Sequence, residues 1–197
     1  MSTLPVILLL SGSLRAGSTN EAVLRTAQAV APSVGMRAVL YGGLAELPHF
    51  NPDDDADPLP ASVVALREAI DGAAGILVCT PEYAGTLPGS FKNLLDWTVG
   101  GTEICGKAAA WVNAAAPGRG QGAEATLRTV LGYTGADVVE NACVKLPVDR
   151  GMVGADVLIA DPAVRRELTE VLGLLVGDRA AFPAVVRSSA GRGGGSG

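Results

Sequence analysis

The stretch Val6-Ile-Leu-Leu-Leu-Ser-Gly-Ser-Leu-Arg-Ala-Gly-Ser-Thr-Asn20 decides how this chain is organised. It begins with an apolar run of strand length, continues as a turn rich in glycine and hydroxyl residues, and is followed by apolar residues at helical spacing. A strand, a glycine-rich turn and a helix in this order direct backbone N–H groups at an anion. The expected helix is capped by Thr19 or Asn20. The stretch therefore predicts a phosphate-binding turn, whose candidate donors are Ser13, Arg15, Ser18, Thr19 and Asn20.

Two well-known phosphate loops are both incomplete in this turn. The spacing of Gly12 and Gly17 fits a nucleoside-triphosphate loop, but Ser18 stands where that loop has its lysine. In a dinucleotide-binding fingerprint the middle glycine would be Ser13, so a close approach of the backbone to a pyrophosphate is disfavoured. Hydroxyl donors suit a terminal monophosphate, which has three oxygens to satisfy. A plain glycine turn before a capped helix is the alternative interpretation.

The composition favours one globular domain, over residues 1–187, because 48% of the 197 residues are hydrophobic and only 18% are charged. Residues 188–197 are rich in glycine and serine, so a flexible tail is expected there. No apolar run approaches the roughly 20 residues of a membrane helix, and the N-terminus lacks a signal-peptide pattern. We therefore expect a cytoplasmic protein that does not bind membranes.

The net charge and the cysteine content exclude further classes of partner and ligand. The net charge of −5 argues against nucleic acid or an anionic membrane as a partner, because both need a basic surface. The three cysteines form no C-x-x-C pair and there is one histidine, so no metal site is expected. Cys79 and Cys143 are expected to behave as small buried hydrophobic residues.

The rest of the chain alternates between expected strands and helices. Further strands are predicted over residues 36–41, 75–80, 108–114 and 137–146, and helices over residues 59–71, 87–97, 123–131 and 161–176. The acidic, proline-bearing segment 42–60 is expected to be a surface loop. This alternation predicts an α/β fold, with a five-stranded parallel sheet and helices on both faces.

The strand order 2-1-3-4-5 would bring three unusual loops to one edge of this sheet. The loops follow the first, third and fourth strands, and the carboxyl ends of parallel strands are where such folds bind ligands. The second of these loops reads Pro81-Glu-Tyr-Ala-Gly-Thr86, and the third, residues 115–122, carries Gly118, Gly120 and Gly122. We therefore expect the phosphate turn and the 81–86 loop to form one site.

Two motifs in these loops resemble those of the NADPH-dependent FMN reductases, a family that includes quinone, azo-dye and chromate reductases. The family's first loop reads G-S-x-R-x-x-S-x-N and its second reads P-E-Y-N-x-[ST]-x-P-x-x-[LF]-K-N-x-x-D-W. The resemblance covers about residues 4–176 and implies a flavodoxin-like three-layer sandwich. The matching residues are Gly12, Ser13, Arg15, Ser18 and Asn20 in the first loop, and Pro81, Glu82, Tyr83, Thr86, Pro88, Phe91, Lys92, Asn93, Asp96 and Trp97 in the second.

The resemblance implies an oxidoreductase that transfers hydride from NADPH or NADH through FMN to a small acceptor, namely a flavin, a quinone, an azo compound or a metal oxyanion. No catalytic side chain is expected, because the flavin performs the chemistry. The family also implies a homodimer or tetramer, with helix 87–97 as a candidate interface. The phosphate would lie on Ser13, Arg15, Ser18, Thr19 and Asn20, and the ring against Pro81, Glu82, Tyr83, Ala84, Gly85 and Thr86, with Gly118 near its pyrimidine end.

One position departs from the family pattern, because Ala84 replaces the usual asparagine. The backbone N–H groups of residues 84–86 are expected still to donate to the ring edge. Glu82 either holds the loop or faces the ribityl chain, and Tyr83 is the best candidate for stacking. Two alternatives to a reductase stay open: a flavin-carrying electron-transfer module, and a flavin-free binding protein on the same fold, which the loss of the asparagine motivates.

Overall fold

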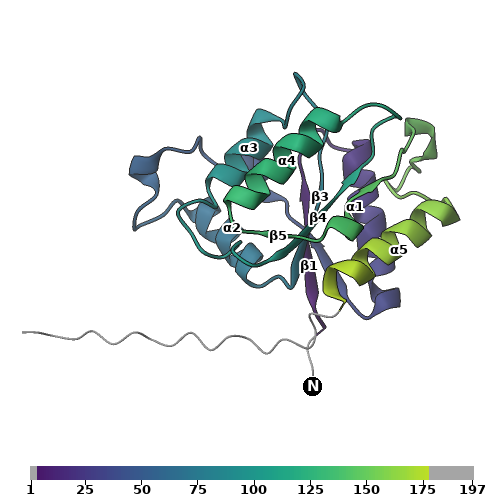
Figure 1. The fold of residues 1–197 in the computed structure, drawn as a ribbon, viewed down its shortest axis with the longest axis horizontal. Helices are drawn as coiled ribbons and strands as arrows, with labels where there is room; N and C mark the ends of the chain where they lie inside the picture. Colours follow the sequence, from purple (N-terminus) through teal and green to yellow (C-terminus); the bar gives the residue numbers. More distant parts are fainter. Residues whose placement is uncertain (1–3, 178–197) are drawn as a thin grey trace, which may run out of the picture.

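The computed structural model of this protein describes residues 4–177, which form a parallel β-sheet between two layers of helices (Figure 1). The strands are β1 Val6–Ser11, β2 Arg37–Leu40, β3 Gly75–Cys79, β4 Ala108–Asn113, β5 Asp137–Val138 and β6 Val144–Lys145. Their order is β2-β1-β3-β4-β5, with β6 also paired to β4, and each of these strand pairs is parallel. The predicted α/β flavodoxin-like fold and strand order are confirmed.

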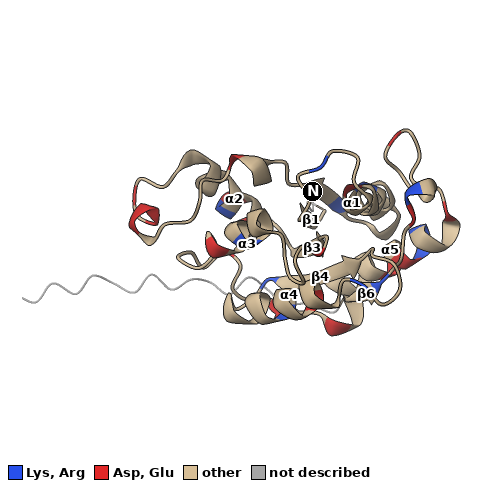
Figure 2. Cartoon of the chain, turned by 90° about the horizontal axis from the view of Figure 1, so that it is seen from above, with Lys and Arg blue, Asp and Glu red and all other residues tan. Residues whose placement is uncertain are grey.

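The two faces of the sheet build two hydrophobic cores. Ile7 and Leu9 of β1 share one core with α1 and α5, whereas Leu8 and Leu10 share the other with α2, α3 and α4. Because both faces are covered, the central strands read as continuous apolar runs rather than as alternating ones. Figure 2 shows the sheet from above, between the two helix layers. The helices are α1 Thr19–Val30, α2 Ala61–Asp71, α3 Gly89–Asp96, α4 Gln121–Tyr133 and α5 Pro162–Val176.

The last predicted strand, over residues 137–146, is interrupted in the structure. β5 pairs with Ala108 and Ala109, β6 pairs with Val112 and Asn113, and a 3₁₀ turn over Glu140–Ala142 separates the two short strands. Ala142 of this turn is fully buried in the core that contains α5. The segment leaves the sheet to fill that core, so the sheet has six strands where five were predicted.

The segment 42–60 lies between β2 and α2 and contains the 3₁₀ turns Gly43–Glu46 and Pro52–Asp54. It was predicted to be a surface loop, and Asp53 and Asp54 are indeed exposed. Asp55 is not, because its carboxylate pairs with Arg67 of α2 at 2.7 Å and only about a tenth of each side chain is exposed. Arg67 also donates two hydrogen bonds to the carbonyl oxygen of Trp97, so the loop is fixed to α2 and to the end of α3.

Charges are spread over the described chain. Figure 2 shows Lys and Arg interspersed with Asp and Glu around both helix layers. Among the helices within residues 4–177, none is long and apolar enough to cross a membrane. The predicted tail, residues 188–197, lies outside the described residues, and the predicted domain boundary at residue 187 does too.

Candidate functional site

Three turns meet at the carboxyl ends of β1, β3 and β4. They are the first turn (residues 12–18), the second turn (residues 81–86) and the third turn (residues 115–122). A Cβ built on Gly12 would lie 2.0 Å from the hydroxyl oxygen of Thr80, and the Gly12 N–H donates to the carbonyl oxygen of Cys79 at 3.0 Å. A Cβ on Gly122 would lie 2.0 Å from the carbonyl oxygen of Gly85. The structure therefore brings the first turn against the residues at the end of β3 that lead into the second turn, and it brings the second turn against the start of α4.

Ser18 of the first turn caps α1. Its hydroxyl oxygen accepts the N–H of Glu21 at 3.1 Å, and the Glu21 carboxylate in turn accepts the N–H of Gly17 at 2.8 Å. The prediction that Thr19 or Asn20 caps this helix was wrong, because they are the first two residues of α1. Arg25, one turn further on, pairs with Glu21 at 2.7 Å and offsets its negative charge beside the turn.

Several donors of the first turn and of the start of α1 have no acceptor within residues 4–177. They include the backbone N–H groups of Thr19 and Asn20 at the N-terminus of α1 and the guanidinium of the exposed Arg15. The hydroxyl oxygen of Ser13 accepts the N–H of Arg15 at 3.2 Å, which leaves its proton to donate elsewhere, as does that of Ser18. Open amides at a helix N-terminus, hydroxyls and an arginine are the donor set that suits a phosphate.

Asn20 connects the first turn to the end of β3. Its side-chain oxygen accepts the thiol of Cys79 at 3.3 Å. Burial raises the pKa of Cys79 to about 12, so the thiol stays protonated and remains a donor at neutral pH. The amide nitrogen of Asn20 keeps its donors for a ligand. Cys79 is a buried residue, as predicted, while Cys143 is only half-buried.

The second turn is a two-residue hairpin. Tyr83 and Thr86 exchange two backbone hydrogen bonds, of 3.0 and 3.1 Å, and the residues between them have positive φ, +50° at Ala84 and +77° at Gly85. These are the features of a type I′ turn. The N–H of Thr86 is therefore already used, contrary to the expectation that it is free. In the described chain the N–H groups of Ala84 and Gly85 have no acceptor, and they lie at an exposed apex beside Tyr83, whose relative exposure is 56%.

Glu82 holds the second turn against α4. Its carboxylate accepts the N–H of Gly122 at 2.7 Å and that of Ala123 at 3.1 Å. Of the two roles considered for Glu82, the structure shows the loop-holding one. Pro81, before it, is half-buried at the end of β3.

The third turn is organised by Asn113, a residue that sequence analysis did not single out. Its amide nitrogen donates to the carbonyl oxygen of Arg119 at 3.1 Å and to the Glu124 carboxylate at 2.7 Å, and its oxygen accepts the N–H of Ala115. Gly118, a predicted ligand residue, lies in this turn with φ of +80°. The available signal was an asparagine at the end of the apolar run 108–112, immediately before a glycine-rich loop.

The end of the second motif has a different role from the turns. Asn93 and the indole N–H of Trp97 both donate to the carbonyl oxygen of Pro48 at 2.8 Å, and Asn93 also accepts the N–H of Phe50. Phe50 packs edge-on against Trp97, with ring centroids 5.0 Å apart. Trp97 is fully buried, so these residues fix the segment that follows β2 rather than present themselves to a ligand.

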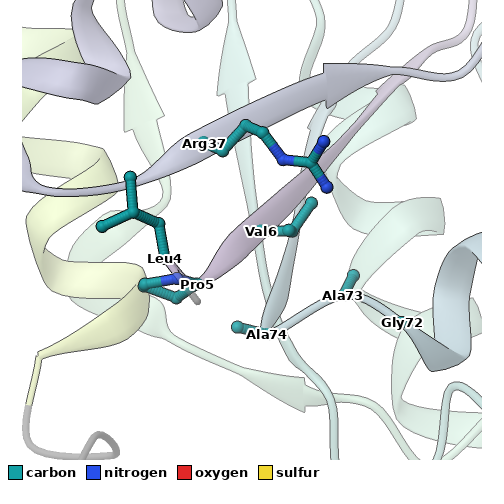
Figure 3. Close-up of a pocket in the computed structure, with 7 residues that line it drawn as sticks. All are labelled: Leu4, Pro5, Val6, Arg37, Gly72, Ala73 and Ala74. Carbon is teal, nitrogen blue, oxygen red and sulfur yellow. The ribbon is translucent and has the colours of Figure 1, made fainter. Parts of the chain in front are cut away.

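A pocket lies at the opposite edge of the sheet. Residues at the amino ends of β1, β2 and β3 line a pocket of about 600 Å³. Figure 3 shows these residues, and among the described ones that line the pocket Arg37 carries the charge. Because strands begin here, this pocket is separate from the three turns. Within residues 4–177, no group of three or more His, Cys, Asp or Glu side chains is placed to hold a metal ion.

Comparison with known proteins agrees with this geometry. A quinone reductase of Escherichia coli (strain K12) is 39% identical over 92 residues, which are 46% of this chain and 48% of that protein. An NAD(P)H-dependent FMN reductase of Pseudomonas aeruginosa is 38% identical over 112 residues, 56% of this chain and 60% of that protein. The chain thus aligns with about half of the length of these curated relatives.

The likeness to solved structures extends further along the chain. The flavoenzyme NAD(P)H:(acceptor) oxidoreductase FerB from Paracoccus denitrificans has 26% identity and a TM-score of 0.70, over 87% of this chain and 97% of that one. A family model described as NADPH-dependent FMN reductase matches residues 5–150, which include all three turns. This chain therefore belongs to the NADPH-dependent FMN reductase family.

Proposed function

We propose that this protein is an NAD(P)H-dependent flavin oxidoreductase that holds FMN across the first and second turns. The observation that carries the proposal is that a turn with open phosphate donors packs against the end of β3, the strand that leads directly into a hairpin with two unused amides. The residues fit a ligand with a terminal phosphate at one end and a flat ring at the other. Bound FMN would supply the hydride chemistry, passing two electrons from a nicotinamide to an acceptor.

The residues of the chain would bind and orient this cofactor. Arg15 and the amides of Thr19 and Asn20 would hold the phosphate, with the hydroxyls of Ser13 and Ser18 as further donors. At the other end, the hairpin amides would donate to the ring, and Pro81, Glu82, Tyr83, Thr86 and Gly118 would border it. No acid or base is required among the described side chains, because a hydride transfer moves no proton to or from the protein in that step.

The acceptor class follows from the relatives. Their names include quinone reductases and an FMN reductase, and the fold is shared with a flavoenzyme that reduces an unspecified acceptor. A small quinone is therefore the first acceptor to try, followed by free flavin, azo compounds and metal oxyanions. Cytoplasmic location and a homodimer or tetramer stay predictions that rest on the sequence and the family resemblance.

The flavin-free alternative is motivated by Ala84 alone, and the geometry of the second turn weakens it. A backbone N–H does not depend on the side chain, and the amides of Ala84 and Gly85 stay open at the apex. The electron-carrier alternative has no structural feature that favours it over a reductase, so it is separated by experiment.

Two measurements test the proposed function. Purified protein titrated with FMN should quench the flavin fluorescence to a saturable end point, and the loaded protein should oxidise NADPH or NADH when a benzoquinone is added. Protein that binds FMN but never consumes either nicotinamide is a carrier. Protein that leaves FMN fluorescence unchanged would refute the site itself.

A further inference from the structure

We propose that Glu82 and Thr126 form a two-point brace that holds the second turn against α4 and so sets the position of the Ala84 and Gly85 amides. This inference rests on the proposed function, because those amides matter to the reaction only if the turn supports a flavin ring. In this scheme Glu82 is a positioning residue, since its contacts are to the protein backbone and not to a reacting atom.

The first point of the brace is the carboxylate of Glu82. The N-cap of α4 is Gly120, which has no side chain to cap the helix. The backbone N–H groups at the start of α4 therefore need an acceptor from elsewhere in the chain. One oxygen of Glu82 accepts two of them, from Gly122 and Ala123. A negative charge is favourable at a helix N-terminus, so the helix and the second turn are stabilised by the same contact.

The second point is a hydrogen bond between two hydroxyls. The oxygens of Thr86 and Thr126 lie 2.8 Å apart, and the Thr126 hydroxyl donates to the carbonyl oxygen of Gly122, also at 2.8 Å. Because a hydroxyl has a single proton, Thr126 acts as the acceptor in the first of these bonds and Thr86 as the donor. Thr86, at the end of the hairpin, is thereby bound to α4, the helix that Glu82 also contacts.

The backbone contact between the two points leaves little room for movement. A Cβ on Gly122 would lie 2.0 Å from the oxygen and 2.8 Å from the carbon of the Gly85 carbonyl, so α4 and the turn touch through their backbones. The apex itself is exposed, and Ala84 has a backbone conformation that alanine rarely adopts. An apex with so little support of its own depends on the brace beneath it.

The variants Glu82→Ala and Thr126→Val each remove one point, and Glu82→Gln keeps an acceptor oxygen and serves as the rescue. Thr129→Val is the matched control, because Thr129 makes the same kind of bond to a carbonyl one turn back in α4, to Ala125 at 3.0 Å, but within residues 4–177 its side chain makes no hydrogen bond to a loop. In flavin-free protein, amide exchange measured by NMR should become faster at Gly122 and Ala123 in Glu82→Ala, and at neither residue in Thr129→Val.

FMN affinity and the midpoint potential of bound FMN provide the functional measurements. Each point of the brace is expected to keep most molecules in the turn conformation that binds FMN. Its loss should weaken FMN affinity about fivefold, because affinity falls in proportion to the fraction of molecules in that conformation. Displaced amides should stabilise the reduced flavin less, so the midpoint potential should become more negative in Glu82→Ala and Thr126→Val. Glu82→Gln should recover most of both losses, and Thr129→Val should stay within about twofold of the wild type in affinity.

The outcomes separate this inference from the proposed function. Wild-type protein that fails to bind FMN would overturn both. Wild-type protein that binds FMN, with Glu82→Ala and Thr126→Val matching its affinity and midpoint potential, would overturn the brace alone, even if amide exchange is faster. Thermal melting checks that each variant is folded, and Thr126→Val keeps the inference testable should Glu82→Ala not fold.

Discussion

The first and third turns both connect the carboxyl end of a strand to the N-terminus of a helix through a glycine-rich segment. In the first turn the cap of α1 is Ser18, a residue of the turn itself, and the amides of Thr19 and Asn20 stay open. In the third turn the cap of α4 comes from Glu82, a residue of another loop, which takes up the amides of Gly122 and Ala123.

This difference shows what glycine content does and does not indicate. Glycines predict that the chain turns tightly before a helix, and both segments do so. Whether the turn can bind an anion depends on the donors that the protein leaves unused and on the charge placed beside them. The Glu82 carboxylate occupies two amides at the N-terminus of α4, whereas the carboxylate near the N-terminus of α1, Glu21, is paired with Arg25 and leaves the amides of Thr19 and Asn20 open. Only the first turn is suited to a phosphate.

The largest effect is expected from a double variant of the first turn. Arg15→Ala with Ser18→Ala removes charge-assisted contacts to the phosphate and should weaken FMN binding by about 2–4 kcal/mol, measured by fluorescence titration. Because Ser18 also caps α1, the free energy of unfolding should fall by about 1 kcal/mol, and urea unfolding measures that part separately.

Arg119→Ala in the third turn is the matched control for this double variant. The Arg119 side chain has no acid partner within residues 4–177, and the hydrogen bonds of this residue are made by its backbone, with Ala116 and with the side chain of Asn113. Its loss should change FMN affinity by less than about twofold. A larger loss for Arg119→Ala than for the double variant would place the phosphate on the third turn instead.

Much of this comparison could be predicted from the sequence, because it depends on local pattern. The apolar runs that become β1, β3 and β4 each lead into a glycine-bearing loop, and parallel strands bring such loops to one edge. Glu82, Asn113 and Thr126 were harder to assign, because their partners lie in other loops or depend on the exact path of a turn. The N-cap was predicted one or two residues too late for a related reason: Ser18, Thr19 and Asn20 are all good caps, and only the backbone path chooses among them.

The interruption of the last strand has a different cause. Residues 137–146 have enough apolar character for a strand, but Ala142 is used to fill the core under α5. Side-chain pattern within one segment does not show which neighbouring element has a space to fill. The missed feature is therefore a matter of tertiary packing, which overrides local strand propensity.

Gly12 of the first turn and Gly118 of the third turn should be required for different physical reasons. Gly12→Ala would place a Cβ 2.0 Å from the oxygen and 2.5 Å from the Cβ of Thr80, and such overpacking should lower the free energy of unfolding by about 2 kcal/mol. Gly118→Ala meets nothing within 4 Å, but its φ of +80° should cost about 1 kcal/mol. Urea unfolding of both variants is the measurement. An equal or larger loss at Gly118 would show that backbone conformation, and not the close approach of Gly12 to Thr80, governs both positions.

The smallest expected effect has the opposite sign and concerns the apex of the second turn. Ala84 has φ of +50° in a type I′ turn, a position where asparagine is strongly preferred, so Ala84→Asn should raise the free energy of unfolding by about 0.5–1 kcal/mol. Ala84→Val, with a branched side chain at the same φ, should lower it. Because the N–H of residue 84 is unchanged by either substitution, FMN affinity should follow the stability of the turn and not the polarity of the side chain. If Ala84→Asn bound FMN much more tightly without stabilising the protein, the asparagine side chain itself would be a ligand to the flavin, and the backbone amides would not be sufficient for binding.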